Sequence, residues 1–191
     1  LTSMSRFTGE SSIFAGSPFV LDTTVTDFEL GQRLVTPDGR AFRWALVGAT
    51  GLTTGNLLQN AAEDTGDQAI TPEAVAIGAT SLVTNSTMTV TANQYAGGWI
   101  LVTVTPGIGQ IFRIKSHAAY TAAAATFTLE DPVQVALTTT SRIDFIANLY
   151  NGVIAHPTTS SGSVVGVAVN NITLAQYGWI QCEGVANVLN D

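Results

Sequence analysis

One hairpin pattern, between Tyr95 and His117, constrains the fold more than any other stretch of this sequence. Runs of β-branched and aromatic residues cover 99–105 and 111–115, and they flank the turn Pro106-Gly107-Ile108-Gly109. Apolar residues alternate with a mixed set in both runs, which is the two-residue period of strands with one buried face. A short loop that contains glycine joins such strands in a β-hairpin. The pattern therefore predicts a hairpin against which further strands pack.

The composition extends this prediction to the whole chain. Charged residues make up 11% of the 191 residues, against roughly 25% in an average soluble domain. Val and Thr are abundant, and both favour strands. Short alternating segments recur at the spacing of all-β proteins. We therefore predict an all-β fold, a β-sandwich or β-barrel built of hairpins, with an extended N-terminal arm and at most one or two short helices.

The order of the segments suggests how the chain is divided. Residues 1–26 have no steady period and predict an extended arm, and residues 27–191 predict a β-rich domain with a possible sub-boundary near 76–81. A second hairpin is expected over 27–47, because Pro37 presets φ and Gly39 suits a left-handed turn position. Further strands are expected over 81–92, 127–129, 133–137, 142–147, 164–169 and 177–185.

Other segments are harder to assign from their pattern. The stretch 57–62 fits a short helix or a strand, and the alanine-rich run 118–125 fits a helix or a loop. Thr71 followed by Pro72 resembles a helix start, with Thr as the cap and Pro in the first position. Asn151-Gly152 predicts a tight turn between 145–146 and 153–154.

The charge pattern excludes several classes of partner. The formal net charge is −7, and the seven basic residues are scattered, with Lys115 the only lysine. Binding to nucleic acid or to an anionic membrane surface needs clustered basic residues, so we expect neither partner. No apolar run reaches the ~18 residues of a membrane helix.

No catalytic, cofactor or metal motif stands out, and we expect no enzyme activity, no cofactor and no metal ion. His117 and His156 lack ligand-spaced neighbours and predict structural roles. Cys182 is alone, so it predicts a buried apolar side chain. The acidic residues within 63–73 raise the question of calcium, but their spacing differs from an EF-hand loop and favours a solvated acidic loop. A weaker alternative is a hydrolase whose carboxylates meet only in space.

Two sets of aromatic residues are candidates for binding. Phe7, Phe14 and Phe19 are single apolar anchors in the polar N-terminal arm. They favour an arm that orders on a partner or a neighbouring subunit over the alternative, a floppy terminus. We take these three as candidate partner-contact residues. Trp44, Trp99 and Trp179 all lie in expected strands. Core packing is the favoured interpretation for them, and a row of exposed rings that binds sugar is the alternative.

Several segments also resemble virion structural proteins of tailed bacteriophages. The resemblance runs from about residue 27 to the C-terminus and rests on 30–44, 128–132 and 165–169 together with Ala92-Asn-Gln-Tyr-Ala-Gly-Gly-Trp99, Gln110-Ile-Phe-Arg-Ile-Lys-Ser-His117, Tyr150-Asn-Gly-Val-Ile154 and Tyr177-Gly-Trp-Ile-Gln181. It implies a head decoration (cement) protein on the capsid surface of the virion, which binds the major capsid protein. A homo-oligomer, with a trimer favoured, is the expected assembly. The alternative is a glycan-binding β-sandwich module of a phage fibre or another surface protein.

Overall fold

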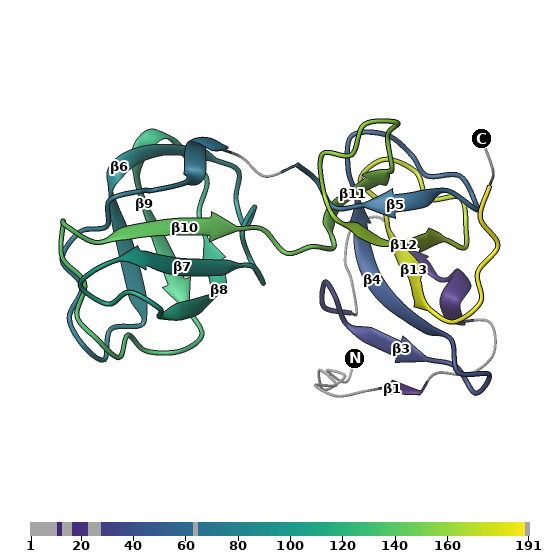
Figure 1. Cartoon of the computed structure of the whole chain (residues 1–191), viewed down its shortest axis with the longest axis horizontal. Coiled ribbons are helices and arrows are strands. Elements are labelled where there is room, and N and C mark those ends of the chain that lie inside the picture. The colour runs from purple at the N-terminus through teal and green to yellow at the C-terminus, as the bar shows by residue number, and fades with distance from the viewer. Residues whose placement is uncertain (1–10, 13–16, 23–27, 63–64, 190–191) are drawn as a thin grey trace, which may run out of the picture. The chain divides into compact units, whose positions relative to one another are not determined.

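The computed structural model describes residues 11–12, 17–22, 28–62 and 65–189, and these form two compact units (Figure 1). The outer unit contains residues 1–62 and 149–191, and the inserted unit contains residues 63–148. The division differs from the one expected from the sequence. It falls at residues 62–63 and 148–149 rather than near 76–81, because the chain leaves the outer unit once and returns to it.

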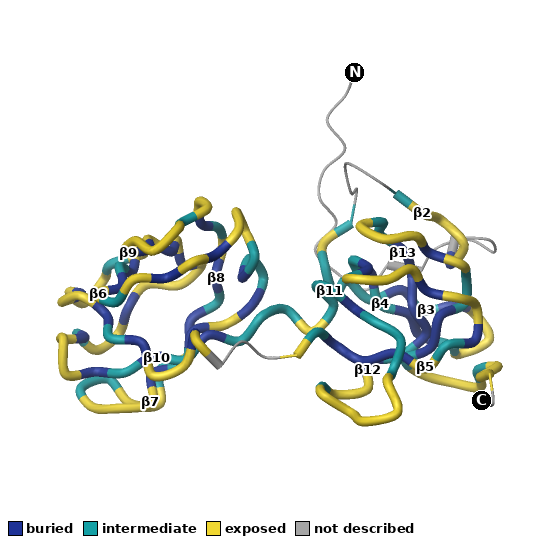
Figure 2. Tube along the Cα trace, turned by 90° about the horizontal axis from the view of Figure 1, so that it is seen from above, coloured by how far each residue is buried: buried dark blue, intermediate teal, exposed yellow. Residues whose placement is uncertain are grey.

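The prediction of an all-β fold is confirmed. The described residues form thirteen strands and two short 3-10 helices, η1 (Ser17–Phe19) and η2 (Thr65–Asp67). Figure 2 shows that buried residues gather in the strands and that much of the connecting chain is exposed. This is the distribution expected when strands with one apolar face enclose a core.

The inserted unit is a five-stranded sheet with the order β10-β7-β8-β9-β6. Its strands are β6 (Ser81–Val90), β7 (Trp99–Val104), β8 (Ile111–His117), β9 (Tyr120–Leu129) and β10 (Arg142–Ile146). All neighbouring pairs in this sheet are antiparallel. The hairpin predicted from the sequence is the β7–β8 pair, and Gly107 and Gly109 take the positive φ values of its turn, 87° and 88°.

The segment 70–73 closes this sheet into a barrel. On one side Ile70 exchanges two backbone hydrogen bonds of 2.9 Å with Ile143 of β10. On the other side the amide of Asn85, in β6, donates to the carbonyl of Thr71 over 2.7 Å. The two edge strands of the sheet are therefore both covered, and closure of this kind removes edges on which other chains could pair.

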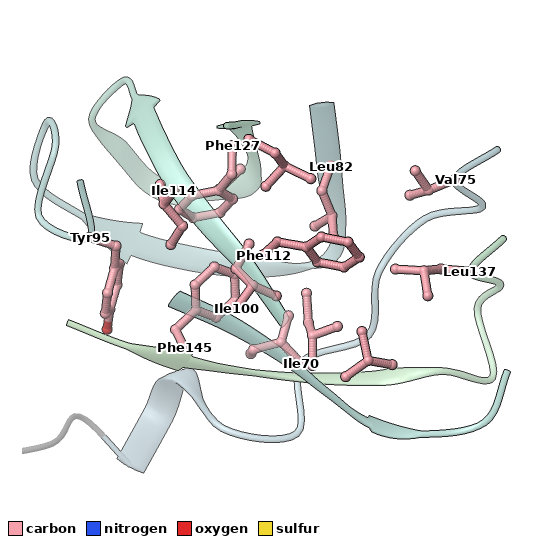
Figure 3. Close-up of a cluster of buried hydrophobic side chains, with 14 of the residues drawn as sticks. Ile70, Val75, Leu82, Tyr95, Ile100, Phe112, Ile114, Phe127, Leu137 and Phe145 are labelled. Atoms are coloured by element: carbon pink, nitrogen blue, oxygen red, sulfur yellow. The ribbon is translucent and has the colours of Figure 1, made fainter. Parts of the chain in front are cut away.

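One apolar cluster fills the inserted unit (Figure 3). Ile100, Phe112, Ile114, Phe127 and Phe145 are at most 2% exposed and come from four different strands. In Figure 3, Tyr95 lies at one end of the cluster and Val75 and Leu137 lie at the other. Burial of an aliphatic or aromatic side chain contributes about 1.5–3 kcal/mol, so this cluster is the main source of stability in the unit.

The outer unit is an eight-stranded sheet with the order β1-β3-β4-β11-β5-β12-β13-β2 and an additional β4–β13 pairing. Its strands are β1 (Ser11–Ser12), β2 (Leu21–Asp22), β3 (Arg33–Val35), β4 (Ala41–Val47), β5 (Leu57–Gln59), β11 (Asn151–Ala155), β12 (Val164–Ala168) and β13 (Tyr177–Glu183). Because β4 pairs with both β11 and β13, strands β4, β11, β5, β12 and β13 form a closed ring. The β3–β4 hairpin is the one predicted over 27–47, and Gly39 has a φ of 84°.

Tertiary pairing overrides two local predictions in the inserted unit. The alanine-rich run lies in strand β9 from residue 120 onwards rather than in a helix or loop, because Ala123 pairs with Met88 and Ala124 with Thr87 of β6. The predicted helix start at Thr71-Pro72 is also wrong, since this segment is extended and bridges β6 and β10. Local propensity is a weak prior when a neighbouring strand offers backbone partners.

Three further assignments change in the structure. Asn151-Gly152 lies inside β11 and is no hairpin turn, because 145–146 and 153–154 belong to different units. The expected strand over 133–137 is reduced to a single bridge between Leu137 and Val75. The ambiguous stretch 57–62 contains the strand β5, which pairs with β11 and β12.

Candidate partner-contact surfaces

The first candidate surface is the segment Pro18 to Asp22 on the outer unit. Pro18 is buried, and Leu21 and Asp22 of β2 pair with Gly178 and Tyr177 of β13. A Cβ at position 178 would lie 3.0 Å from Cδ2 of Leu21 and 2.6 Å from Cδ1 of Ile172. Glycine therefore makes room for the close approach of this segment to the barrel. The segment that the sequence assigned to the arm is thus partly built into the fold.

This pairing leaves three consecutive apolar side chains on the surface. Phe19 is 60% exposed, and Val20 and Leu21 are also exposed. The Asn170 side chain donates to the carbonyl of Phe19 over 3.3 Å, which fixes the backbone beside the ring. Of the three candidate contact residues, Phe19 is exposed as a contact role requires. Phe7 and Phe14 lie outside the described residues.

The second candidate surface is at one end of the inserted barrel. We call it the loop end, and it consists of the loops 76–79, 106–109 and 133–135. Each loop carries one exposed aliphatic side chain, namely Ile77, Ile108 and Val135. Val104 and Ile111, at the adjoining ends of β7 and β8, are exposed as well. No sequence motif marks these residues, although isolated aliphatic residues in glycine- and proline-containing loops are a visible signal.

Hydrogen bonds join the three loops into one surface. The Gln110 side chain accepts from the amides of Gln134 and Val135 at 2.9 and 2.8 Å, and it donates to the carbonyls of Val135 and Gly107 at 2.9 and 3.2 Å. The amide of Gly78 donates to the carbonyl of Val133 over 2.8 Å. Because these bonds fix the loops before any contact forms, association through this end loses little conformational entropy.

The three tryptophans do not form a row of exposed rings. Trp44 and Trp179 are fully buried in the outer unit, with ring centroids 5.1 Å apart, and Phe28 contacts both rings edge-on. Trp99 is 40% exposed on β7, and the Arg113 guanidinium lies 5.5 Å from its ring centroid. Core packing, the favoured interpretation, accounts for two of the three.

His117 is buried in the inserted unit, and its hydrogen bonds define its tautomer. Its Nε2 accepts from the Tyr95 amide over 3.0 Å, so Nδ1 carries the proton that it donates to the Ala118 carbonyl over 2.9 Å. Burial lowers the pKa of His117, which favours this neutral form. The ring thus joins the Tyr95 segment to the end of β8. His156 donates its backbone amide to the carbonyl of Leu57, next to β11.

Cys182 lies on β13 and is partly buried. Its thiol donates to the Val165 carbonyl over 3.2 Å. Burial raises the pKa of the Cys182 thiol to about 11, so the nucleophilic thiolate is scarce at neutral pH. Tyr150, whose pKa burial also raises, packs beside the thiol, and the Arg43 guanidinium lies 6.0 Å from its ring centroid.

Several acidic groups of the described residues have partners at separate places in the fold. The Asp67 carboxylate accepts a short hydrogen bond from the Tyr95 hydroxyl, and the Asp144 carboxylate accepts from the Ala69 amide over 2.7 Å. Glu183, in the outer unit, pairs with Arg33 at 3.0 Å. Within 11–12, 17–22, 28–62 and 65–189, no three His, Cys, Asp or Glu side chains gather around a common point. Glu63 and Asp64, which belong to the acidic stretch considered for calcium, lie outside these ranges.

Comparisons with protein-family models, with curated proteins and with solved structures found no match to this chain. Both helices of the described residues are three-residue 3-10 turns, and neither is long and apolar enough to cross a membrane.

Proposed function

We propose that this chain is a viral structural protein that decorates and stabilises a phage capsid by binding its major capsid protein. The sequence segments that resemble virion proteins of tailed phages suggest this class of partner. One structural observation carries the proposal: the apolar run Phe19-Val20-Leu21 is fixed to the outer barrel by β2–β13 pairing and is exposed. An apolar run held in this way offers contact area to a protein without the loss of much backbone entropy.

The mechanism follows from surface burial. A phenylalanine side chain transferred from water into a protein contact contributes about 1.5–3 kcal/mol. Phe19 would bury its exposed face against the capsid, and the residues before it would add contacts along the shell. The two barrels act as rigid bodies in this mechanism, and the capsid gains stability because each bound copy links neighbouring capsid subunits.

The test uses virions of the phage whose genome encodes the chain. The protein is expected among the structural proteins of purified virions, and capsids that lack it are expected to bind the purified chain. Phe19→Ser should raise the dissociation constant at least about 10-fold, the loss of roughly 1.4 kcal/mol. Val185→Ser is the control, because Val185 is 92% exposed on the same unit and lies at the other end of the chain.

Deletion of residues 1–16 is a second variant, since it leaves Pro18 and β2 in place. It removes the two-residue strand β1 at the edge of the sheet, outside the closed ring of strands, so it should weaken attachment while the barrel is retained. Deletion of residues 1–26 is a poorer test, because it also removes the strand that pairs with β13. The proposal is wrong if virions lack the chain, or if the Phe19 variant and the deletion both bind capsids as tightly as the unaltered protein.

A further inference from the structure

We propose that the outer unit binds a carboxylate at Arg43, at one end of its closed ring of strands. The carboxylate comes from a small organic acid or from an acidic side chain of another protein, and the group that is recognised is the same in both cases. The proposal does not depend on capsid binding. It rests on three features of Arg43: its charge balance, the arginine opposite it, and the contacts that hold its guanidinium in place.

Arg43 lies near the start of β4 and faces the inside of the ring. Side chains alternate along a strand, so Arg43 shares its face with Ala45 and Val47, which belong to the apolar cluster of the outer unit. Tyr150, just before β11, and Cys182, near the end of β13, pack against the same cluster. Arg43 is therefore half-buried at the rim of this core.

The charge of Arg43 is not balanced by the residues that the structure describes. Arg33, Arg40 and Arg113 each pair with a carboxylate, at 3.0, 2.7 and 3.3 Å, whereas no carboxylate of the described residues forms an ion pair with Arg43. This occurs in a chain whose acidic residues outnumber its basic ones by 14 to 7. A charge that is partly removed from water without a counter-ion is costly, and a bound anion would offset that cost.

A second guanidinium lies across the sheet from Arg43. Arg33 of β3 is the direct cross-strand partner of Arg43, and like charges in such a pair repel each other. The Glu183 carboxylate, from β13, pairs with Arg33 at 3.0 Å. Two positive groups and one negative group sum to a charge of +1. This local charge favours a monoanion such as a carboxylate over dianionic phosphate, which the Glu183 carboxylate would repel more strongly.

Contacts within the outer unit hold the Arg43 guanidinium in place. Its Nη1 donates to the Gly31 carbonyl over 2.7 Å, and the Gly31 amide donates in turn to the Trp44 carbonyl over 2.8 Å. The guanidinium lies over the Tyr150 ring, 6.0 Å from its centroid. A guanidinium has five N–H donors in a planar fork that matches a carboxylate. Because its position is fixed beforehand, little side-chain entropy is lost when the ligand binds.

The experiment is an NMR titration of the purified full chain with sodium acetate, which replaces sodium chloride so that the ionic strength and its screening stay constant. The Arg43 Nε–H and Gly31 amide resonances are expected to shift and to saturate. Arg43→Gln removes both the charge and the fork, and it should raise the dissociation constant at least about 10-fold. Arg142→Gln is the matched control and should leave binding unchanged, because Arg142 belongs to the inserted unit and likewise donates to backbone carbonyls.

Arg43→Lys separates recognition from a purely structural role. Lysine keeps the charge and can donate to the Gly31 carbonyl, but it lacks the planar fork, so acetate binding should weaken a few-fold. If Arg43 only held the Gly31 turn, the lysine variant would bind acetate as the wild-type chain does. Urea unfolding gives a second measure, because acetate should raise the midpoint of the wild-type chain and not that of Arg43→Gln. Circular dichroism checks that each variant is folded.

Two further probes identify the source of the carboxylate and test its chemistry. A capped peptide with one glutamate between glycines represents an acidic side chain of a protein, and acetate represents a free acid. Tighter binding of the peptide assigns the site to a protein partner, and tighter binding of acetate assigns it to a small acid. Inorganic phosphate that binds more tightly than both carboxylates would overturn the choice of a carboxylate.

Three other results would overturn the proposal. The first is that acetate shifts neither the Gly31 amide nor the Arg43 side-chain resonance. The second is that Arg43→Gln retains the full response of the Gly31 amide. The third is that Arg142→Gln weakens binding as much as Arg43→Gln does, which would show a general effect of charge and not a site.

Discussion

The Gln110 side chain links two loops of the inserted barrel, and its removal gives a quantitative prediction. Its amide makes four hydrogen bonds to backbone groups of the loops 106–109 and 133–135. Net contributions of such bonds are roughly 0.5–1.5 kcal/mol each. Three of the four are exposed to solvent, where water replaces a lost partner, so the lower value applies. Gln110→Ala is therefore expected to destabilise the inserted unit by about 2 kcal/mol.

Hydrogen exchange measures this effect at two levels. The amides of Gln134 and Val135 donate directly to the Gln110 side chain, so their exchange should accelerate most. The core amides of β8 report the stability of the whole unit, and a loss of 2 kcal/mol accelerates their exchange about 30-fold when they exchange through global opening. Urea unfolding gives an independent value of the same free energy.

Gln134→Ala is the matched control for this variant. The Gln134 side chain makes a single exposed hydrogen bond, of 2.9 Å, to the Pro132 carbonyl, and its backbone amide is retained in the variant. A loss of about 0.5 kcal/mol is expected. If Gln110→Ala is no more destabilising than Gln134→Ala, and if the amides of residues 134 and 135 keep their protection, then the reasoning about linked loops is wrong.

Two further predictions concern single positions. Gly98→Ala should destabilise the inserted unit by about 2 kcal/mol or more, because a Cβ there would overlap the Ile146 carbonyl oxygen across the β7–β10 pair, and overpacking against backbone is not easily relaxed. Gly109→Ala is the comparison, because a Cβ at position 109 would meet nothing within 4 Å. This variant should lower the stability of the unit by only about 1 kcal/mol, through the left-handed φ of residue 109. Equal urea midpoints for the two variants would contradict the steric argument. Cys182 should react slowly with iodoacetamide at pH 8 in the folded chain, because burial raises the pKa of its thiol to about 11. The folded state should also lose stability as the pH rises from 9.0, the ordinary pKa of a thiol, towards about 11, because the thiol of the unfolded chain releases its proton first. Equal alkylation rates in buffer and in urea would refute this.

The strand assignments that sequence predicts well share a physical property. The β7–β8 and β3–β4 hairpins carry alternating apolar residues and turns with Gly107, Gly109 or Gly39, whose positive φ the local sequence alone specifies. Information within about twenty residues determines such pairs. The buried aromatic residues follow as well, since Phe112 and Phe127 occupy the alternating positions of their strands.

The surface candidates were only partly predictable for a related reason. Phe19 could be singled out because it is an aromatic residue in a polar stretch, and the structure adds that β2–β13 pairing fixes it. The exposed aliphatic residues of the loop end are visible in the sequence, but their gathering into one surface is not. Ile77, Ile108 and Val135 are 27 to 58 positions apart, and hydrogen bonds between distant segments, among them those of Gln110 and Gly78, bring their loops together.

The sequence by itself determined the class of this protein: an all-β chain with few charges, whose hairpins are specified by local alternation and by turn residues. Only the tertiary structure decided that 63–148 forms a separate barrel between the two chain segments of the outer unit, that most of the alanine-rich run is a strand, and that Thr71-Pro72 joins two sheet edges. The physical reason is that these features depend on backbone partners far away along the chain. A segment with weak preferences of its own takes the conformation that satisfies the hydrogen-bonding groups beside it.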